Sequence, residues 1–105
     1  MPCESDPVIV EHALLQVTPG RGEEFRAAFA EAKSIIAGMP GFSNLRLSRG
    51  IESPDTYLLL VEWQTVADHT EGFRGSPGYQ RWRALLHHFY EPFPVVEHFD
   101  PVDGV

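Results

Sequence analysis

The feature that most constrains the fold is the order in which strand-like and helix-like segments follow one another. Residues 8–17 (VIVEHALLQV) begin with β-branched and apolar side chains and end at a turn signal, which predicts a strand. Apolar residues then recur at steps of three and four over residues 23–37, which predicts an amphipathic helix. Strands are predicted next from residue 45 toward Gly50, and over residues 56–64 (TYLLLVEWQ), whose apolar centre indicates burial on both faces.

The second half of the chain predicts a helical part that is divided in two. Thr65 followed by Asp68 forms a variant of the capping box and predicts a short helix over residues 66–73. Ser76 and Pro77 are typical of the N-cap and the first residue of the next helix, which ends before two prolines.

Residues 95–99 (VVEHF) predict a last short strand, so the whole order is β-α-β-β-α-β. This is the ferredoxin-like arrangement of an α+β domain. We expect one such domain over residues 8–99, with flexible tails at residues 1–7 and 100–105.

Alternation of side chains divides the first predicted strand into two faces. We expect His12 on the face that the helices cover, looking into a cavity. The opposite face would then be mostly apolar, carrying Glu11, Ala13, Leu15 and Val17. Because helices cover only one face of such a sheet, we expect a homodimer that pairs sheet against sheet. A compact monomer in light scattering would contradict this architecture.

The composition argues against several classes of partner. Net charge is −7, and no cluster of Lys or Arg exceeds two residues, so nucleic acid is not expected as a partner. The longest apolar run, residues 57–61, is too short for a membrane span. The first seven residues lack the basic flank and apolar stretch of a signal peptide, and the single Cys3 cannot form an internal disulfide. We therefore expect a cytoplasmic protein.

Several short motifs carry a family resemblance. They are VIVEHA at residues 8–13, PGRGEEF at 19–25, MPGF at 39–42, VEWQ at 61–64, His69, and FRGSP at 73–77. Together they resemble the antibiotic biosynthesis monooxygenase family, whose members are small dimeric α/β-barrel proteins. The likeness extends over residues 8–99.

The resemblance implies an oxidoreductase that oxidises a small aromatic quinol or polyphenol to a quinone with dioxygen, using no metal or flavin. Quinone-forming members rely on a Trp at the end of the third strand and an Arg in the last helix, which Trp63 and Arg83 match. His69 stands where these members have a Tyr, and Leu59 where the family can have an Asn.

Oxygenation without a cofactor requires a base, a group that stabilises negative charge, and a dry aromatic pocket. His12 and His69 are the candidate bases because histidine titrates near neutral pH. Trp63 and Arg83 are the candidate orienting and charge-stabilising groups. The expected pocket walls are Phe73, Trp82 and Phe89. Each residue also has a structural interpretation, since aromatic residues dominate cores and an Arg can simply form an ion pair.

Other functions compete with this hypothesis. A non-catalytic module of the same fold would bind a small hydrophobic ligand, or only dimerise. Haem degradation is less favoured, because the positions of the Asn, Trp and His used by haem-degrading members hold His12, Gly72 and Arg83 here. A metal site is not expected, because the adjacent His87 and His88 diverge by about 100° on a helix.

Overall fold

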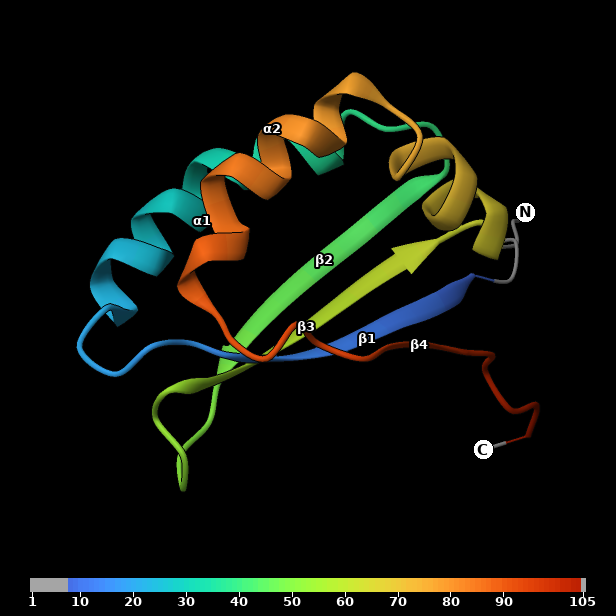
Figure 1. The fold of residues 1–105 in the computed structure, drawn as a ribbon. Coiled ribbons are helices and arrows are strands. Elements are labelled where there is room, and N and C mark those ends of the chain that lie inside the picture. Colours follow the sequence, from blue (N-terminus) through green and yellow to red (C-terminus); the bar gives the residue numbers. More distant parts are fainter. Residues whose placement is uncertain (1–7, 105) are drawn as a thin grey trace.

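The computed structural model describes residues 8–104, in which a four-stranded antiparallel sheet carries helices on one face (Figure 1). The strands lie side by side in the order β2-β3-β1-β4. Their bounds are β1 (Ile9–Gln16), β2 (Phe42–Arg49), β3 (Thr56–Trp63) and β4 (Val96–Phe99). The helices are α1 (Gly22–Ala37), the π-helix η1 (Asp68–Phe73), α2 (Pro77–Leu86) and the 3-10 turn η2 (His87–Phe89). The predicted β-α-β-β-α-β order and ferredoxin-like fold are confirmed.

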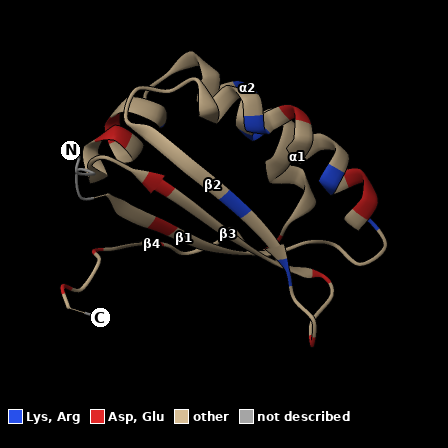
Figure 2. Cartoon of the chain, turned by 180° about the vertical axis from the view of Figure 1, so that it is seen from behind, with Lys and Arg blue, Asp and Glu red and all other residues tan. Residues whose placement is uncertain are grey.

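Helix α1 follows the amphipathic pattern that its sequence predicts. Its inward stripe packs on the sheet and consists of Phe25, Phe29, Ala32 and Ile36. Glu23 and Glu24 lie in its first turn, where the helix dipole stabilises acidic groups. Charged residues of both signs are spread over the helices, strands and loops (Figure 2).

The second helical part begins at the capping residues that the sequence indicates. The Thr65 hydroxyl accepts from the backbone N–H of Asp68, and the Asp68 carboxylate accepts from the N–H of Thr65, both at 3.1 Å. Gly41 lies against this capping box with φ +84°, and a Cβ there would come within 2.2 Å of the Asp68 carboxyl group. The Ser76 hydroxyl accepts from the N–H of Tyr79 at 3.2 Å and caps α2.

Helix η1 has the wider π geometry, which the sequence does not predict. The N–H of Arg74 donates to the carbonyl of His69, five residues earlier, at 3.1 Å. His69 and Phe73 both point inward from this turn and are 3% and 2% exposed. The π turn therefore directs an imidazole and an aromatic ring into the space between helices and sheet.

The predicted orientation of the first strand is wrong. The side of β1 that faces the helices is the apolar one, with Glu11, Ala13, Leu15 and Val17 all buried. His12 lies on the open face beside the exposed Leu14. The physical reason is that the helices cover the more apolar stripe of a strand, and that stripe includes Ala13, Leu15 and Val17 rather than His12.

Strand β3 is buried fully on one face only. The helix-facing side chains Tyr57, Leu59, Val61 and Trp63 are buried, and those between them are half-buried. The predicted burial on both faces therefore holds only in part. The open face of the sheet has no helix over it among residues 8–104.

The described part of the chain continues past β4 without a further helix or strand. Residues 100–104 form neither helix nor strand, and the predicted flexible tail at residues 1–7, with Cys3, lies outside the described residues. No helix within residues 8–104 is long and apolar enough to cross a membrane.

Candidate active site

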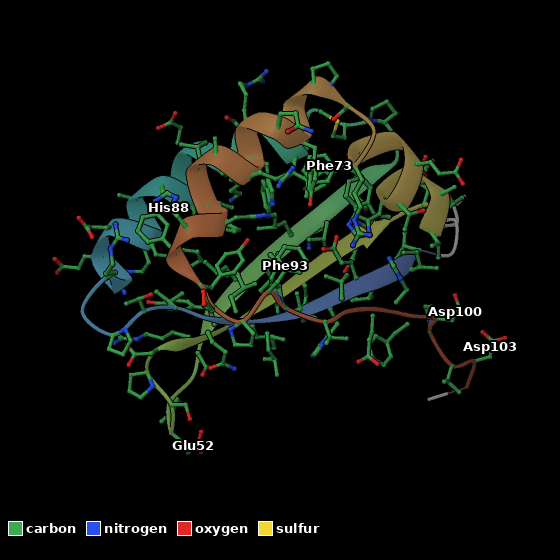
Figure 3. The ribbon with its side chains drawn as sticks, viewed as in Figure 1. Glu52, Phe73, His88, Phe93, Asp100 and Asp103 are labelled. Atoms are coloured by element: carbon green, nitrogen blue, oxygen red, sulfur yellow. The ribbon has the colours of Figure 1, made fainter. Side chains whose placement is uncertain are left out.

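A small cavity of about 40 Å³ lies between the sheet, η1, α2 and the segment that follows η2. Its walls are largely aromatic and aliphatic, including Phe73, Trp82, Phe93, Leu15 and Leu59. Six polar side chains also line it: Glu11, His69, Arg74, Tyr79, His87 and Tyr90. Figure 3 labels Phe73 on η1 and Phe93 on the segment between η2 and β4. An apolar cavity with a few converging polar groups is the usual form of a small-molecule site.

Glu11 is a buried acid held by an indole. The residue is 5% exposed, and its Oε1 accepts a hydrogen bond from Nε1 of Trp63 at 2.9 Å. The two residues meet because Glu11 pairs with Val61 across the β1–β3 ladder, which places Trp63 diagonally opposite on the same face. Burial raises the pKa of the Glu11 carboxyl above its ordinary value, and the Trp63 bond and the charge of Arg74 oppose that rise.

His69 connects this carboxyl to a second imidazole. Its Nε2 lies 3.4 Å from Oε1 of Glu11, and its Nδ1 lies 2.9 Å from Nε2 of His98. The His69 ring also stacks on Trp63, with ring centres 5.6 Å apart and planes at 23°. Burial, together with Arg74 and His98, lowers the pKa of His69 to about 3, so its imidazole is neutral at pH 7.

The register in which the edge strand β4 pairs with β1 positions His98 at the site. Strand β4 pairs with β1 so that His98 lies opposite Glu11, and the strand brings the imidazole toward η1. His98 is half-buried, and burial and the charge of Arg74 lower its pKa. Glu11, His69 and His98 therefore form a line from the cavity to the edge of the sheet.

This line is unsuited to holding a single metal ion. His69 turns different ring nitrogens toward Glu11 and His98, and the two nitrogens of one imidazole cannot bind the same ion. Within residues 8–104, no group of three His, Cys, Asp or Glu side chains is placed to hold a metal.

The structure brings together only part of the predicted site. Trp63 and His69 are in contact, and the expected wall residues Phe73 and Trp82 line the cavity. The expected wall residue Phe89 is instead packed in the core, with its ring centre 5.8 Å from that of Phe25.

Arg83 and His12 lie away from the cavity. Arg83 is exposed on α2, where its charge adds to the effect of burial in lowering the pKa of His87. His12 lies on the opposite face of the sheet, in contact with the ring of Phe99, and its buried Nδ1 has no hydrogen-bond partner within residues 8–104. Of the four candidate catalytic residues, Trp63 and His69 therefore meet at this site, and His12 and Arg83 do not join them.

Sequence reasoning missed several polar members of the site: Glu11, His98, Arg74, Tyr79 and Tyr90. A signal for Glu11 exists, because the acid shares a strand face with Ala13, Leu15 and Val17, and a carboxyl in an apolar stripe needs a buried partner. Arg74, and not the predicted Arg83, is the arginine close to this site, since its charge lowers the pKa values of Glu11, His69 and His98.

Comparisons with known proteins agree with this fold. Residues 8–85 match the sequence profile of the antibiotic biosynthesis monooxygenases. The chain is 54% identical over 95 residues to the uncharacterized protein YczJ of Bacillus subtilis (strain 168), covering 90% of this chain and all of that one.

Two solved structures share the architecture. A Bordetella bronchiseptica protein assigned to the antibiotic biosynthesis monooxygenases superposes with a TM-score of 0.88 and 36% identity, covering 91% of this chain and 98% of the other. SnoaB of Streptomyces nogalater, described as a cofactor-independent oxygenase, superposes with a TM-score of 0.69 and 20% identity, covering 96% of both chains.

Proposed function

The chain belongs to the antibiotic biosynthesis monooxygenase family, and from that premise we propose that it oxidises a small aromatic quinol or polyphenol to a quinone with dioxygen. The observation that carries this proposal is the buried Glu11 carboxyl, held by Trp63 and His69 at the wall of an aromatic cavity. The description of SnoaB, which has the same fold, as a cofactor-independent oxygenase supports the same class of reaction.

Glu11 is the base in this proposal. Both of its close contacts fall on Oε1, which leaves Oε2 to accept the proton of a phenolic hydroxyl. Burial raises the pKa of Glu11 in the direction that makes a carboxylate a stronger base. His69 supports the carboxylate through Nε2, so the predicted catalytic histidine acts beside the base.

The developing phenolate needs groups that stabilise its charge. Arg74 supplies a cation at the cavity wall, in the role first expected of Arg83. Tyr79 and Tyr90 supply hydroxyl groups that can donate to the phenolate oxygen. Burial raises the pKa of Tyr90, which keeps its hydroxyl protonated and able to donate.

The ionised substrate itself reduces dioxygen in the proposed reaction. The phenolate passes one electron to O₂, which gives a substrate radical and superoxide. These two combine and form a C–O bond at an activated ring or benzylic carbon. In the reacting tautomer of the substrate, this carbon bears two hydrogens. The peroxide takes up a proton, the carbon loses its remaining hydrogen as a proton, and the O–O bond breaks to leave a carbonyl and water. Carbon is oxidised by four electrons and O₂ is reduced by the same four, with no external reductant.

Access to the cavity requires movement of the segment at residues 92–95. The cavity of about 40 Å³ is far smaller than the roughly 300 Å³ or more of a ligand pocket. Phe93 is 60% exposed and lines both this cavity and a groove on the open face beside His12. The segment is held at both ends, by the bond from Glu91 N–H to the Gln16 carbonyl at 3.2 Å and by β4. We expect substrate to enter where Phe93 swings outward.

The test is oxygen uptake and quinone absorbance with purified protein and a panel of quinols and polyphenols. Glu11→Gln should reduce kcat by about 100-fold or more, the usual contribution of a general base. His88→Ala is the matched control, since His88 is exposed on η2 and does not line the cavity (labelled in Figure 3). No quinone with any substrate, or equal rates for wild type and Glu11→Gln, would overturn the proposal.

The small, largely apolar cavity also favours a second candidate, a non-catalytic module that binds a hydrophobic ligand. The same panel separates the two functions. Ligands that raise the melting temperature without oxygen uptake would indicate binding alone.

We also propose a homodimer, formed through the open face of the sheet rather than the face first expected. This face exposes large apolar side chains, including Leu14 at 45% and Phe99 at 50%. A second copy would cover them by a symmetric pairing. Light scattering should give twice the chain mass for wild type and the chain mass for Leu14→Asp, with Gln80→Asp on the outer side of α2 as control. A monomeric wild type would contradict the dimer.

A further inference from the structure

We propose that Glu11, His69 and His98 form a proton relay that connects the cavity to solvent at the edge of the sheet. This inference rests on the proposed function, because it assigns the path of the proton that Glu11 removes from substrate. It adds His98, a residue outside the cavity wall, to the machinery of the reaction.

The geometry of His69 is that of a bridging group. Its two ring nitrogens lie on opposite sides of the imidazole, and each faces a partner: His98 Nε2 at a hydrogen-bond distance of 2.9 Å, and Glu11 Oε1 at 3.4 Å, a contact that has to shorten for a proton to pass. The stack on Trp63 fixes the plane of the ring, and Trp63 donates a hydrogen bond to the carboxyl oxygen that faces His69. An imidazole held in this way can take a proton at one nitrogen and release another from the opposite nitrogen.

Because Glu11 and His69 are buried, a proton from Glu11 needs a bridging group to reach water, and His98 is the group nearest to solvent. Glu11 and His69 are 5% and 3% exposed, so neither exchanges protons freely with bulk water. His98 lies on β4, the edge strand of the sheet, and is only half-buried. Its Nε2 faces His69, which leaves Nδ1 on the other side of the ring for water.

The three groups have two proton arrangements that a concerted shift interconverts. In the first, Glu11 is protonated, and both His69 and His98 carry their proton on Nδ1. The proton that Glu11 takes up on Oε2 reaches His69 when the carboxyl turns about its Cγ–Cδ bond and presents that oxygen to Nε2 of His69. Nδ1 of His69 then passes its proton to Nε2 of His98, and Nδ1 of His98 releases one proton to water. The second arrangement therefore has an ionised Glu11 and both imidazoles protonated on Nε2, with every proton accounted for.

The proposed reaction returns the relay to its starting arrangement. Each proton that the base removes from the substrate is matched by one that the peroxide, or the hydroxide it leaves, takes up. An outward shift is therefore followed by an inward shift, and neither imidazole has to rotate. Arg74 acts on all three groups and disfavours a lasting positive charge on either imidazole, so protons pass through without being stored.

The first experiment needs no substrate. In ¹⁵N-labelled wild-type protein, a scalar coupling between Nδ1 of His69 and Nε2 of His98 would demonstrate an N–H···N hydrogen bond between the rings. The tautomers of the two rings should change together when Glu11 is replaced by Gln. His88→Ala should leave both spectra unchanged. Absence of the coupling in wild type, or tautomers that do not respond to Glu11→Gln, would overturn the relay.

The second experiment uses turnover. His98→Ala should reduce kcat by about tenfold or more with little change in KM, and added imidazole should restore most of the loss by carrying protons in place of the missing ring. A loss that imidazole does not restore would indicate a structural role and overturn the relay. If wild type turns over no substrate, the proposed function fails, and the coupling measurement alone decides whether the three groups exchange protons.

Discussion

The hydrogen bond between Trp63 and Glu11 allows the electrostatics of the site to be measured without any substrate. Trp63→Phe keeps an aromatic ring in place but removes the N–H that Glu11 accepts at 2.9 Å. Trp63 is 0% exposed and Glu11 is 5% exposed, so water does not replace the lost donor. A hydrogen bond to a charged group contributes about 1.5–3 kcal/mol to stability, and the smaller ring costs on the order of 1 kcal/mol more. We therefore expect Trp63→Phe to lower the free energy of unfolding by about 2.5–4 kcal/mol.

A double-mutant cycle with Glu11→Leu isolates the bond itself. Glu11→Leu also removes the contact with His69, but that loss occurs in both the single and the double variant and cancels in the cycle. The coupling energy should be about 1.5–3 kcal/mol at pH 8, the condition of the two in which Glu11 is more ionised. It should fall to about 1 kcal/mol at pH 4, because the raised pKa of Glu11 leaves a neutral carboxyl there that binds the indole less strongly.

Urea unfolding of the four proteins, at one protein concentration and at both pH values, measures the cycle. The fixed concentration matters because association would itself change the apparent stability. A coupling energy below about 0.5 kcal/mol at pH 8, or one that is equal at the two pH values, would refute the assignment of a buried carboxylate held by Trp63.

Three further predictions test other parts of the structure. Gly41→Ala should lower the free energy of unfolding by at least about 1 kcal/mol more than Gly20→Ala, as measured by thermal or urea unfolding. Both glycines have positive φ, but only Gly41 lies against Asp68, so equal losses would argue against that contact. The folded pKa of His69 is about 3 against an ordinary 6.5, so the unfolded chain binds more protons between these values and stability falls as pH drops through this window. From pH 7 to pH 5 the loss due to His69 is about 2 kcal/mol, and His69→Leu should lack it in urea unfolding; an unchanged loss would refute the shift. Phe93→Ala should increase the rate at which quinols bind to the protein, as measured by stopped-flow fluorescence. An unchanged binding rate would contradict the proposed access route.

The fold could be predicted from sequence because local signals agreed with one another. The strand over residues 56–64, the helix over residues 23–37 and the capping pair Thr65 and Asp68 each have a short-range physical cause, and each lies where the pattern predicts. The alternation of β1 was also readable. Its assignment to the two faces is wrong because the helices cover the face with three apolar side chains, Ala13, Leu15 and Val17, and not the face with His12.

The site could be predicted only in part, because it depends on long-range register. Trp63 and His69 were identified, but their partner Glu11 is 52 residues from Trp63 in sequence, and His98 is 29 residues from His69. The π turn of η1 adds a further uncertainty, since its wider spacing determines where His69 and Phe73 point. No short-range sequence pattern predicts these long-range contacts.

Because β4 pairs with β1, the length of the segment before β4 determines which side chain of β4 faces the site. Only four residues of β4 fix its register, and side chains alternate along it, so a slip by one position would turn His98 outward and bring Glu97 or Phe99 to face η1. A single insertion or deletion between Tyr90 and Val96 would then exchange an imidazole for a carboxylate or a benzyl group without altering any residue of the site. In relatives of this chain, the spacing of those residues is therefore as informative about reactivity as their identity.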